Sequence, residues 1–290
     1  MRFLGSTFYA YQYGLGGIKE TVNAILDFLT EEGMLRARGS RLYATRLGRR
    51  VSELYIDPVS AVTIRDGLER GAKRLTDFSF LHMVCRTPDL SRRPHPSRKE
   101  VDDIRLYIDE HADEFMFEAP DEWVDRVSYG EVLREVKAAM VLEAWINEVT
   151  EAAILERFNV EPGDLYYLTE TANWLLYATR EIADLLGHKD LLSRISTLKD
   201  RVKHGVKEEI APLARLRGIG RVRARMLYNS GFRTMADLRR ASLERLASVP
   251  LIGMRTARGI KEQVGGLIEE GEWKRARRER DQKRISEFIS

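Results

Sequence analysis

The sequence contains little cysteine and no long hydrophobic run. Cys85 is the only cysteine among the 290 residues, which excludes an intrachain disulfide and a cysteine-rich zinc site and is typical of a reducing compartment. No apolar run approaches the ~20 residues of a membrane span, and no secretory signal peptide is visible. We therefore expect a cytoplasmic protein that does not bind a membrane.

The sequence also lacks the motifs of familiar catalytic centres. It has no Gly-x-x-x-x-Gly-Lys-Ser/Thr phosphate-binding loop, no Asp-Glu box and no dinucleotide-binding fingerprint. The histidines, at positions 82, 95, 111, 188 and 204, are scattered and lack the spacing of metal ligands. Acidic pairs such as Asp121-Glu122 fall in expected loops or on solvated helix faces. We therefore predict no catalytic residue, no metal site and no cofactor within this chain.

A marked division of charge stands out instead. The whole chain has 48 Lys and Arg against 45 Asp and Glu, so its net charge is only +3. Residues 201–290 nevertheless hold 22 basic and 11 acidic residues, while residues 1–200 hold 26 and 34. A basic segment of this kind favours contact with a polyanion.

Residues 162–187 form the clearest single element of the sequence. Pro162 suits the first position of a helix, and Gly187 suits a left-handed stop. At about 100° per residue, one broad face collects Leu165, Leu168, Ala172, Leu175, Leu176, Thr179, Ile182, Ala183 and Leu186. Tyr167, Trp174 and Tyr177 fall on roughly the opposite side, where a helix with one apolar stripe normally carries charge.

Two interpretations of these three rings stay open. In the first, a second layer of protein covers them. In the second, they form a stacking platform for single-stranded nucleic acid, because every base has a π-face and each stacked base contributes ~1–3 kcal/mol. Tyr167 and Trp174 are separated by about two helical turns, or ~10.5 Å, which allows contact with a strand at two points.

The N-terminal part and the middle of the chain are expected to be mainly helical. Helices followed by a short basic hairpin, with a turn at Gly39-Ser40, make a winged-helix pattern whose opening is missing. Such a domain either contacts duplex DNA or packs against a neighbour. A short extended run then ends at Asp57-Pro58, and residues 59–207 follow as helices, including a long one over roughly Gly130 to Phe158.

The strongest local motif lies at Leu216 to Gly220, which fits the helix-hairpin-helix pattern. Its glycines let the backbone approach a phosphate closely, and the N–H groups that open the next helix point at it. The predicted phosphate-binding residues are Gly218, Ile219, Gly220, Arg221, Arg223 and Arg225. In a second copy Leu251 replaces the first glycine, so we expect this copy to be a structural partner. The alternative is a hairpin that only packs.

The last residues match a peptide that binds a sliding clamp. Such peptides carry Gln-x-x-aliphatic followed by two bulky residues, and the predicted clamp-binding residues are Gln282, Ile285, Phe288 and Ile289. One helical turn would gather the apolar ones as a plug for a hydrophobic groove. A tail helix that docks on its own domain is the alternative.

Five blocks of the sequence resemble one known family, the archaeal Ski-two-like, superfamily-two DNA helicases of the Hel-three-oh-eight type. The blocks are RRVSELYIDPVSA, FLHMVCRTPD, LERFNVEPGDLYYLTETANWLLYA, DRVKHGVKEEI and IGRVRARMLYNSGFRT. The resemblance implies a mainly α fold with a small β wing: a partial winged helix (1–58), a helical ratchet bundle (59–207), a helix-hairpin-helix domain (208–270) and a basic tail (271–290). The family's two RecA-like motor domains, with their ATP and magnesium, are not represented.

The resemblance also implies roles for single residues. The family's ratchet helix stacks on DNA bases through a Trp, which corresponds to Trp174, and an Arg, whose position holds Tyr167. Tyr177 adds a third ring nearby. The family's arginine-rich segment corresponds to Arg221, Arg223 and Arg225, which implies strand binding and coupling to the motor.

Two functions of different classes follow from these observations. The first is the non-motor, DNA-guiding half of an ATP-dependent 3′–5′ helicase in fork repair, with single-stranded or forked DNA and RecA-like motor domains as partners. The second is a stand-alone adaptor that recruits a sliding clamp or a single-strand-binding protein to forks. A winged-helix transcription regulator, and RNA as the natural strand, stay open as well.

Overall fold

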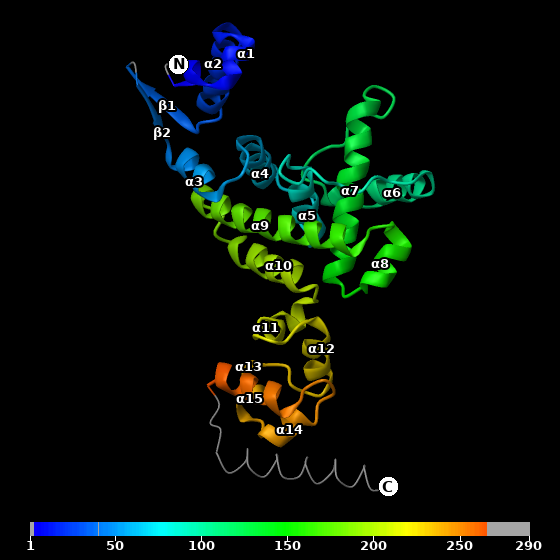
Figure 1. Cartoon of the computed structure of the whole chain (residues 1–290). Coiled ribbons are helices and arrows are strands. Elements are labelled where there is room, and N and C mark those ends of the chain that lie inside the picture. The colour runs from blue at the N-terminus through cyan, green and yellow to red at the C-terminus, as the bar shows by residue number, and fades with distance from the viewer. Residues whose placement is uncertain (1–2, 40, 266–290) are drawn as a thin grey trace. The chain divides into compact units, whose positions relative to one another are not determined.

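The computed structural model describes residues 3–39 and 41–265, and it is mainly α-helical (Figure 1). These residues fall into two compact units, one of residues 3–136 and 174–195 and the other of residues 137–173 and 196–265. The predicted mainly α fold with a small β wing is confirmed. Among the helices of the described ranges, none combines the length and the hydropathy that crossing a bilayer requires.

The first unit begins with the segment that the sequence predicts to be a partial winged helix. Its elements are the short 3₁₀ turn η1 (Leu4–Ser6), α1 (Phe8–Tyr13), α2 (Leu15–Glu31), β1 (Leu35–Arg38), β2 (Arg41–Ala44) and α3 (Arg46–Leu54). The two strands pair antiparallel, with Leu35 opposite Ala44 and Arg38 opposite Arg41, as the predicted hairpin requires.

The base of the hairpin is fixed by Thr45 and Gly48. The Thr45 hydroxyl donates to the carbonyl of Gly33 at 2.7 Å and accepts from the amide of Gly48 at 3.1 Å, which caps α3. A Cβ atom on Gly48 would lie 2.1 Å from the carbonyl oxygen of Met34, so only glycine permits this approach. The helix that Thr45 caps continues to Leu54, so residues 51–54 are helical. The extended run predicted for these residues is wrong.

A helical body completes the first unit. It contains α4 (Pro58–Arg70), α5 (Asp77–Arg86), α6 (Arg98–Glu110) and η2 (Ala112–Glu114), together with parts of α7, α9 and α10. All side chains from Phe78 to Cys85 on α5 are buried, as expected for a helix at the centre of a core. Ile64, Leu68, Leu90 and Ile104 of the same unit are buried as well.

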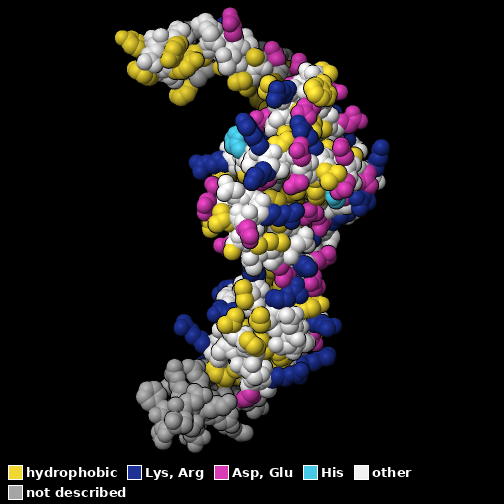
Figure 2. Space-filling view, turned by 90° about the vertical axis from the view of Figure 1, so that its right-hand side faces the viewer, with side chains coloured by type: hydrophobic (Ala, Val, Ile, Leu, Met, Phe, Trp, Pro, Cys, Tyr) yellow, Lys and Arg dark blue, Asp and Glu magenta, His cyan; other side chains and the backbone are white. Residues whose placement is uncertain are grey.

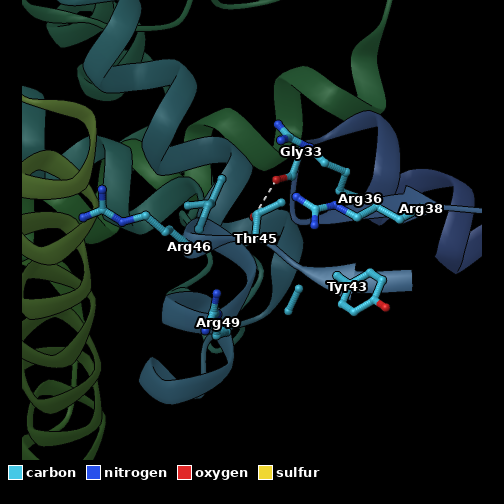
Figure 3. A pocket seen from close by; sticks show the side chains of 9 residues that line it. Gly33, Arg36, Arg38, Tyr43, Thr45, Arg46 and Arg49 are labelled. Atoms are coloured by element: carbon cyan, nitrogen blue, oxygen red, sulfur yellow. Dashed lines mark hydrogen bonds between the residues drawn. The ribbon is translucent and has the colours of Figure 1, made fainter. Parts of the chain in front are cut away.

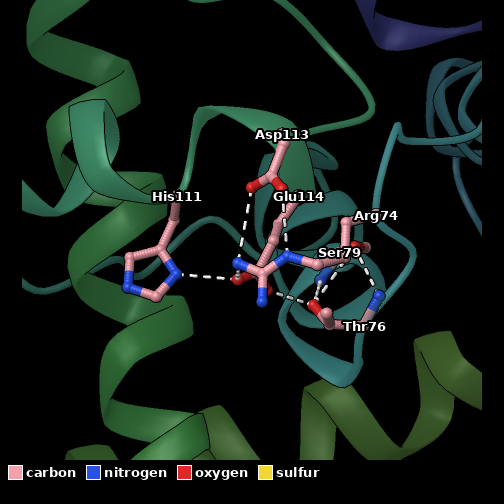
Figure 4. A network of polar contacts seen from close by, with 6 residues as sticks. All are labelled: Arg74, Thr76, Ser79, His111, Asp113 and Glu114. Atoms are coloured by element: carbon pink, nitrogen blue, oxygen red, sulfur yellow. Dashed lines mark hydrogen bonds and ion pairs between the residues drawn. The ribbon is translucent and has the colours of Figure 1, made fainter.

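A polar network fastens the loop before α5 to η2 (Figure 4). The Glu114 carboxylate accepts hydrogen bonds from Arg74 at 2.6 Å, from His111 Nδ1 at 2.8 Å, and from the hydroxyl of Thr76. Burial acts to raise the pKa of Glu114, but these donors outweigh it and lower the pKa. Thr76 also forms a capping box with Ser79, so the network defines where α5 begins.

The second unit joins a helical corner to the helix-hairpin-helix domain. The corner consists of the end of α7 (Arg126–Ile146), the short α8 (Glu151–Phe158) and the start of α9 (Pro162–Leu186). The single helix predicted over Gly130 to Phe158 is wrong, because Glu148 adopts a left-handed conformation (φ 65°) and Thr150 caps a new helix. Helix α10 (Leu192–His204) then leads to the last domain.

The helix-hairpin-helix domain has its own apolar core. It contains η3 (Glu208–Ile210), α11 (Ala211–Ala214), α12 (Arg221–Asn229), α13 (Met235–Arg240), α14 (Leu243–Ala247) and α15 (Met254–Gln263). The largest buried side chains of its core are Ile210, Leu213, Ile219, Leu227, Phe232, Leu238, Leu243, Leu246, Ile252 and Ile260. The predicted hairpin module is therefore present and well packed.

Candidate nucleic-acid interface

Helix α9 forms as the sequence predicts, from Pro162 to Leu186, with Gly187 in the left-handed conformation (φ 89°). The predicted apolar stripe from Leu165 to Ala183 is buried, and Leu186 is partly buried. The three rings outside the stripe differ from one another in exposure. Tyr177 is exposed, whereas Tyr167 and Trp174 are half-buried.

Trp174 is held in place by helix α3. Its indole N–H donates to the carbonyl oxygen of Leu54 at 3.1 Å. Leu54 is the last residue of α3, where helix carbonyls have no partner within the helix, so Trp174 supplies one of the missing donors. The indole orientation is thereby fixed before any ligand arrives.

Tyr177 is held by the same helix through Arg50. The Arg50 guanidinium donates to the Tyr177 hydroxyl at 3.4 Å and to Glu53 at 2.9 Å, and it forms a further ion pair with Glu181. Hydrogen bonds to Glu53 and Glu181 raise the pKa of Arg50. Helix α3 therefore positions both rings of the first unit. Tyr167 belongs to the second unit.

The first hairpin has the geometry expected of a phosphate cradle. Gly218 adopts the left-handed conformation (φ 78°), Ile219 is buried in the core, and Gly220 caps α12 without any side-chain hydrogen bond. A Cβ atom on either glycine would meet nothing within 4 Å, so the backbone here is open to an approaching group. Uncapped N–H groups at a helix start attract anions.

The three arginines that follow have different surroundings. Arg223 is exposed and donates to the carbonyls of Gly218 at 2.8 Å and Leu251 at 3.2 Å. Arg221 is half-buried: it lies 4.4 Å from the centre of the Trp145 ring and donates to the carbonyl of Val149 at 2.9 Å. Burial lowers the pKa of Arg221.

Arg225 is engaged by two carboxylates. It donates to Glu148 through Nε at 2.9 Å and through its terminal nitrogen at 2.5 Å, and to Glu209 at 2.8 Å. Of the three arginines, therefore, only Arg223 stands at the open surface of the hairpin.

The second hairpin repeats the geometry of the first with a different residue at the first glycine position. Leu251 occupies the left-handed position (φ 65°) that Gly218 occupies in the first copy, and Gly253 caps α15 without a side-chain hydrogen bond. Arg223 donates to both hairpin turns and so links them. Figure 2 shows Lys and Arg side chains around this domain, in the lower described part of the view.

Sequence reasoning missed a basic pocket at the foot of the wing (Figure 3). Arg36 and Arg38 from β1, and Arg46 and Arg49 from α3, surround Thr45 there, with Tyr43 beside them. Within the described ranges none of these four arginines has an ion-pair partner. The available signal was local: residues 33–52 contain six arginines and no acidic residue.

In the described part of the chain, no cluster of three or more His, Cys, Asp or Glu side chains is arranged to hold a metal. The clamp-binding residues Gln282, Ile285, Phe288 and Ile289 lie outside the described residues.

Comparison with known families places these features in context. Residues 78–205 match the family described as "Archaeal helicase, domain 4", and residues 210–265 match the "SAM-like Helix-hairpin-helix tandem" family. The chain is 40 % identical over 270 residues to the "ATP-dependent DNA helicase Hel308" of Methanocella arvoryzae, covering 92 % of this chain and 36 % of that protein. It is 39 % identical to the protein of the same name from Pyrococcus horikoshii, covering 91 % and 36 %.

A relative from Aeropyrum pernix with the same name is 36 % identical, covering 91 % of this chain and 35 % of the relative. The chain thus spans about a third of the length of the curated relatives it matches. The resemblance predicted from the sequence is confirmed: the chain is similar, over about nine tenths of its length, to the C-terminal part of proteins named ATP-dependent DNA helicase Hel308.

Proposed function

We propose that the chain is the DNA-guiding, non-motor part of an ATP-dependent 3′–5′ DNA helicase that acts in replication-fork repair. In this role it binds single-stranded or forked DNA by base stacking and by contacts with phosphates. RecA-like motor domains supply ATP hydrolysis, because this sequence lacks a phosphate-binding loop. The names of its relatives, all ATP-dependent DNA helicases, support this proposal.

The paired hairpins of the helix-hairpin-helix domain are the observation that carries the proposal. Each hairpin combines a left-handed residue with a helix start that no side chain caps, and so offers free backbone N–H groups to an anion. The two pairs are Gly218 with Gly220 and Leu251 with Gly253. Arg223, exposed and bonded to both turns, adds a cation between them. Two such points favour successive phosphates of one strand.

Trp174 and Tyr177 are the proposed stacking residues of the first unit. Leu54 and Arg50 already hold the two rings in one orientation. The rings therefore lose less side-chain entropy when a base stacks on them. Tyr167 is proposed to contact the strand through its own part of α9.

The wing pocket favours a contact with the duplex side of a fork. Arg36, Arg38, Arg46 and Arg49 form a cluster of cations that have no ion-pair partner among the residues the structure describes. They lie around a hairpin, the arrangement with which a wing contacts DNA phosphates. The adaptor alternative depends on the clamp-like peptide and on a single-strand-binding partner, for which the described residues supply no observation.

The proposal is tested by fluorescence anisotropy with labelled single-stranded, forked and duplex oligonucleotides. Trp174→Ala is expected to weaken single-strand binding about tenfold, in line with the loss of one stacked base. Trp174→Phe keeps a ring but loses the bond to Leu54, and it should retain most of the affinity. Arg36→Ala with Arg38→Ala should weaken forked and duplex binding and make its salt slope shallower by ~1.8.

Trp123→Ala serves as the matched control, because Trp123 is 95 % exposed on a loop whose neighbours are acidic. This variant should bind all three oligonucleotides like the unmodified chain. Unchanged binding by Trp174→Ala would refute the stacking role. Equal losses in the Ala and Phe variants would assign the effect to the Leu54 contact instead.

A further inference from the structure

Arg225 lies between two carboxylates that come from distant parts of the sequence. Glu148 stands in the corner between α7 and α8, where its backbone is left-handed, and Glu209 stands in η3 just before the first hairpin. Glu148 also accepts the backbone N–H of Lys207 at 3.0 Å. The two carboxylates therefore join Arg225 both to the helical corner and to the segment that enters the domain.

Arg221 reinforces the same junction from one turn earlier on α12. Its guanidinium lies over the ring of Trp145, and it donates to the carbonyl of Val149. Residues four apart share one face of a helix, so Arg221 and Arg225 both face the corner. Arg223 lies between them in sequence and points to the hairpins.

Arg225 is shared by two carboxylates at this junction. Two carboxylates face one guanidinium that is bonded to both, and the side chains of Glu148 and Arg225 remain 18 % and 24 % exposed. Burial acts to raise the pKa of Glu148, but the bonds from Arg225 and from the Lys207 amide outweigh it and lower the pKa, so the carboxylate is ionised at neutral pH. An anion that approaches α12 therefore finds Arg225 already bonded to two carboxylates.

A phosphate offers Arg225 the same kind of partner as a carboxylate. Both groups accept paired hydrogen bonds from a planar guanidinium, so one can replace the other without a change in the arginine. The exchange is favoured near the first hairpin, because the exposed Arg223 and the uncapped start of α12 are positioned to bring a strand there.

We propose that Glu148 and Glu209 form a carboxylate clasp that occupies Arg225 until a phosphate of a bound strand displaces them. Strand binding to the helix-hairpin-helix domain thereby loosens the contact between α12 and the corner at Glu148. The inference rests on the proposed strand binding and adds its regulation: the clasp sets how many phosphates the domain contacts. Glu148 and Glu209 act as positioning residues for Arg225.

The test measures binding of a labelled (dT)20 oligonucleotide by the full chain across a range of KCl concentrations. Glu148→Gln frees Arg225 for the strand, so its affinity should rise several-fold and its salt slope should steepen by ~0.7, the value for one more phosphate contact on a single strand. Glu209→Gln should act in the same direction with a smaller effect. In Glu148→Gln with Arg225→Gln the gain should disappear.

Glu262→Gln provides the control for net charge. Glu262 pairs with Arg258 at 3.1 Å on the exposed face of α15, so this change removes the same charge from the domain without releasing Arg225. A gain of affinity in the control equal to that of Glu148→Gln would overturn the proposal. No change, or a loss, in Glu148→Gln would also overturn it, provided that circular dichroism shows the variant folded.

Hydrogen exchange supplies a readout that a purely structural ion pair would not move. The Lys207 amide donates to Glu148, which Arg225 holds in place. When a bound oligonucleotide releases Glu148 from Arg225, this amide should exchange faster. Slower exchange there would count against the clasp. If the unmodified chain does not bind the oligonucleotide at all, the proposed function fails first, so the two failures are distinguishable.

Discussion

His82 illustrates how a single residue of the first unit depends on its surroundings. It lies fully buried on α5 between the rings of Phe78 and Phe115, and neither ring nitrogen has a hydrogen-bond partner. Burial, followed by the charges of Arg86 and Arg93, lowers the pKa of His82 to about 3. The imidazole is therefore neutral at physiological pH, and it acts as an apolar ring of the core.

We predict that this residue makes the chain sensitive to acid. Below pH ~6.5, the ordinary pKa of histidine, His82 becomes protonated in the unfolded chain but stays neutral in the folded chain. The free energy of unfolding therefore falls as the pH decreases from 6.5 toward 3. Between pH 7 and pH 5 the loss should be about 2 kcal/mol. His82→Phe should lose less over the same interval, as measured by urea denaturation followed by circular dichroism.

Met83→Leu, a change of similar volume at another buried position of α5, is the matched control and should keep the pH dependence of the unmodified chain. Glu135 lies 3.6 Å from His82, and burial raises its pKa. This carboxyl group adds stability as the pH falls, opposite to the effect of His82. The informative quantity is therefore the difference in pH dependence between His82→Phe and the unmodified chain. An identical pH dependence in His82→Phe and the unmodified chain would contradict this account of His82.

At the level of elements, local signals predicted helices better than their interruptions. Pro162 and Gly187 mark the ends of α9 because capping depends on neighbours in the sequence, and the apolar stripe follows from helical periodicity. The break between α7 and α8 was missed, although Thr150 is a good cap, because the apolar pattern continues across it. Glu148 is stabilised in its left-handed conformation by hydrogen bonds from Arg225 and from the Lys207 amide, both far along the chain.

The candidate site shows the same limit. The sequence predicts on which elements Trp174, Tyr177 and the hairpin glycines lie, because these positions follow from local patterns. It did not predict that Leu54 and Arg50 hold the two rings, or that Arg225 faces Glu148, because those contacts join residues 77 to 127 positions apart. Which arginines are exposed is decided by tertiary contacts, and the spacing of the three gives no sign of it.

The two hairpins allow a paired test of backbone strain. Gly218 and Leu251 occupy equivalent left-handed positions, where a side chain with a Cβ atom is disfavoured. Gly218→Ala should destabilise the domain by about 1 kcal/mol, although no neighbour contacts the new methyl group. Leu251→Gly should stabilise it by about 0.5 kcal/mol, since relief of strain exceeds the added entropy of the unfolded chain.

These opposite signs are measured by hydrogen exchange of the buried core amides in α12 and α15. Leu251 is 62 % exposed, so little apolar contact is lost with its side chain. A loss of stability in Leu251→Gly would mean that the leucine side chain, and not the turn alone, stabilises the second hairpin.

At the scale of the whole molecule, the chain exposes an aromatic surface that its own described residues leave uncovered. Phe8, Tyr9, Tyr11 and Tyr13 of α1 are all exposed, Tyr11 by 87 %, and they pair as Phe8 with Tyr11 and Tyr9 with Tyr13. Figure 2 shows hydrophobic side chains gathered at the top of the view, the end at which Figure 1 labels α1. Exposed aromatic groups of this size mark interaction surfaces.

The proposed function indicates what contacts this surface, because the chain spans about a third of its relatives' length and the motor is not represented in it. We predict that the part of the Methanocella arvoryzae relative preceding the matched segment, produced separately, binds this chain. Phe8→Ser with Tyr11→Ser should weaken that binding at least tenfold in isothermal titration calorimetry, since aromatic anchors dominate interface energies. Tyr166→Ser, at an exposed ring on α9, should leave it unchanged. Binding that survives the double substitution would assign this aromatic surface to a partner other than the motor.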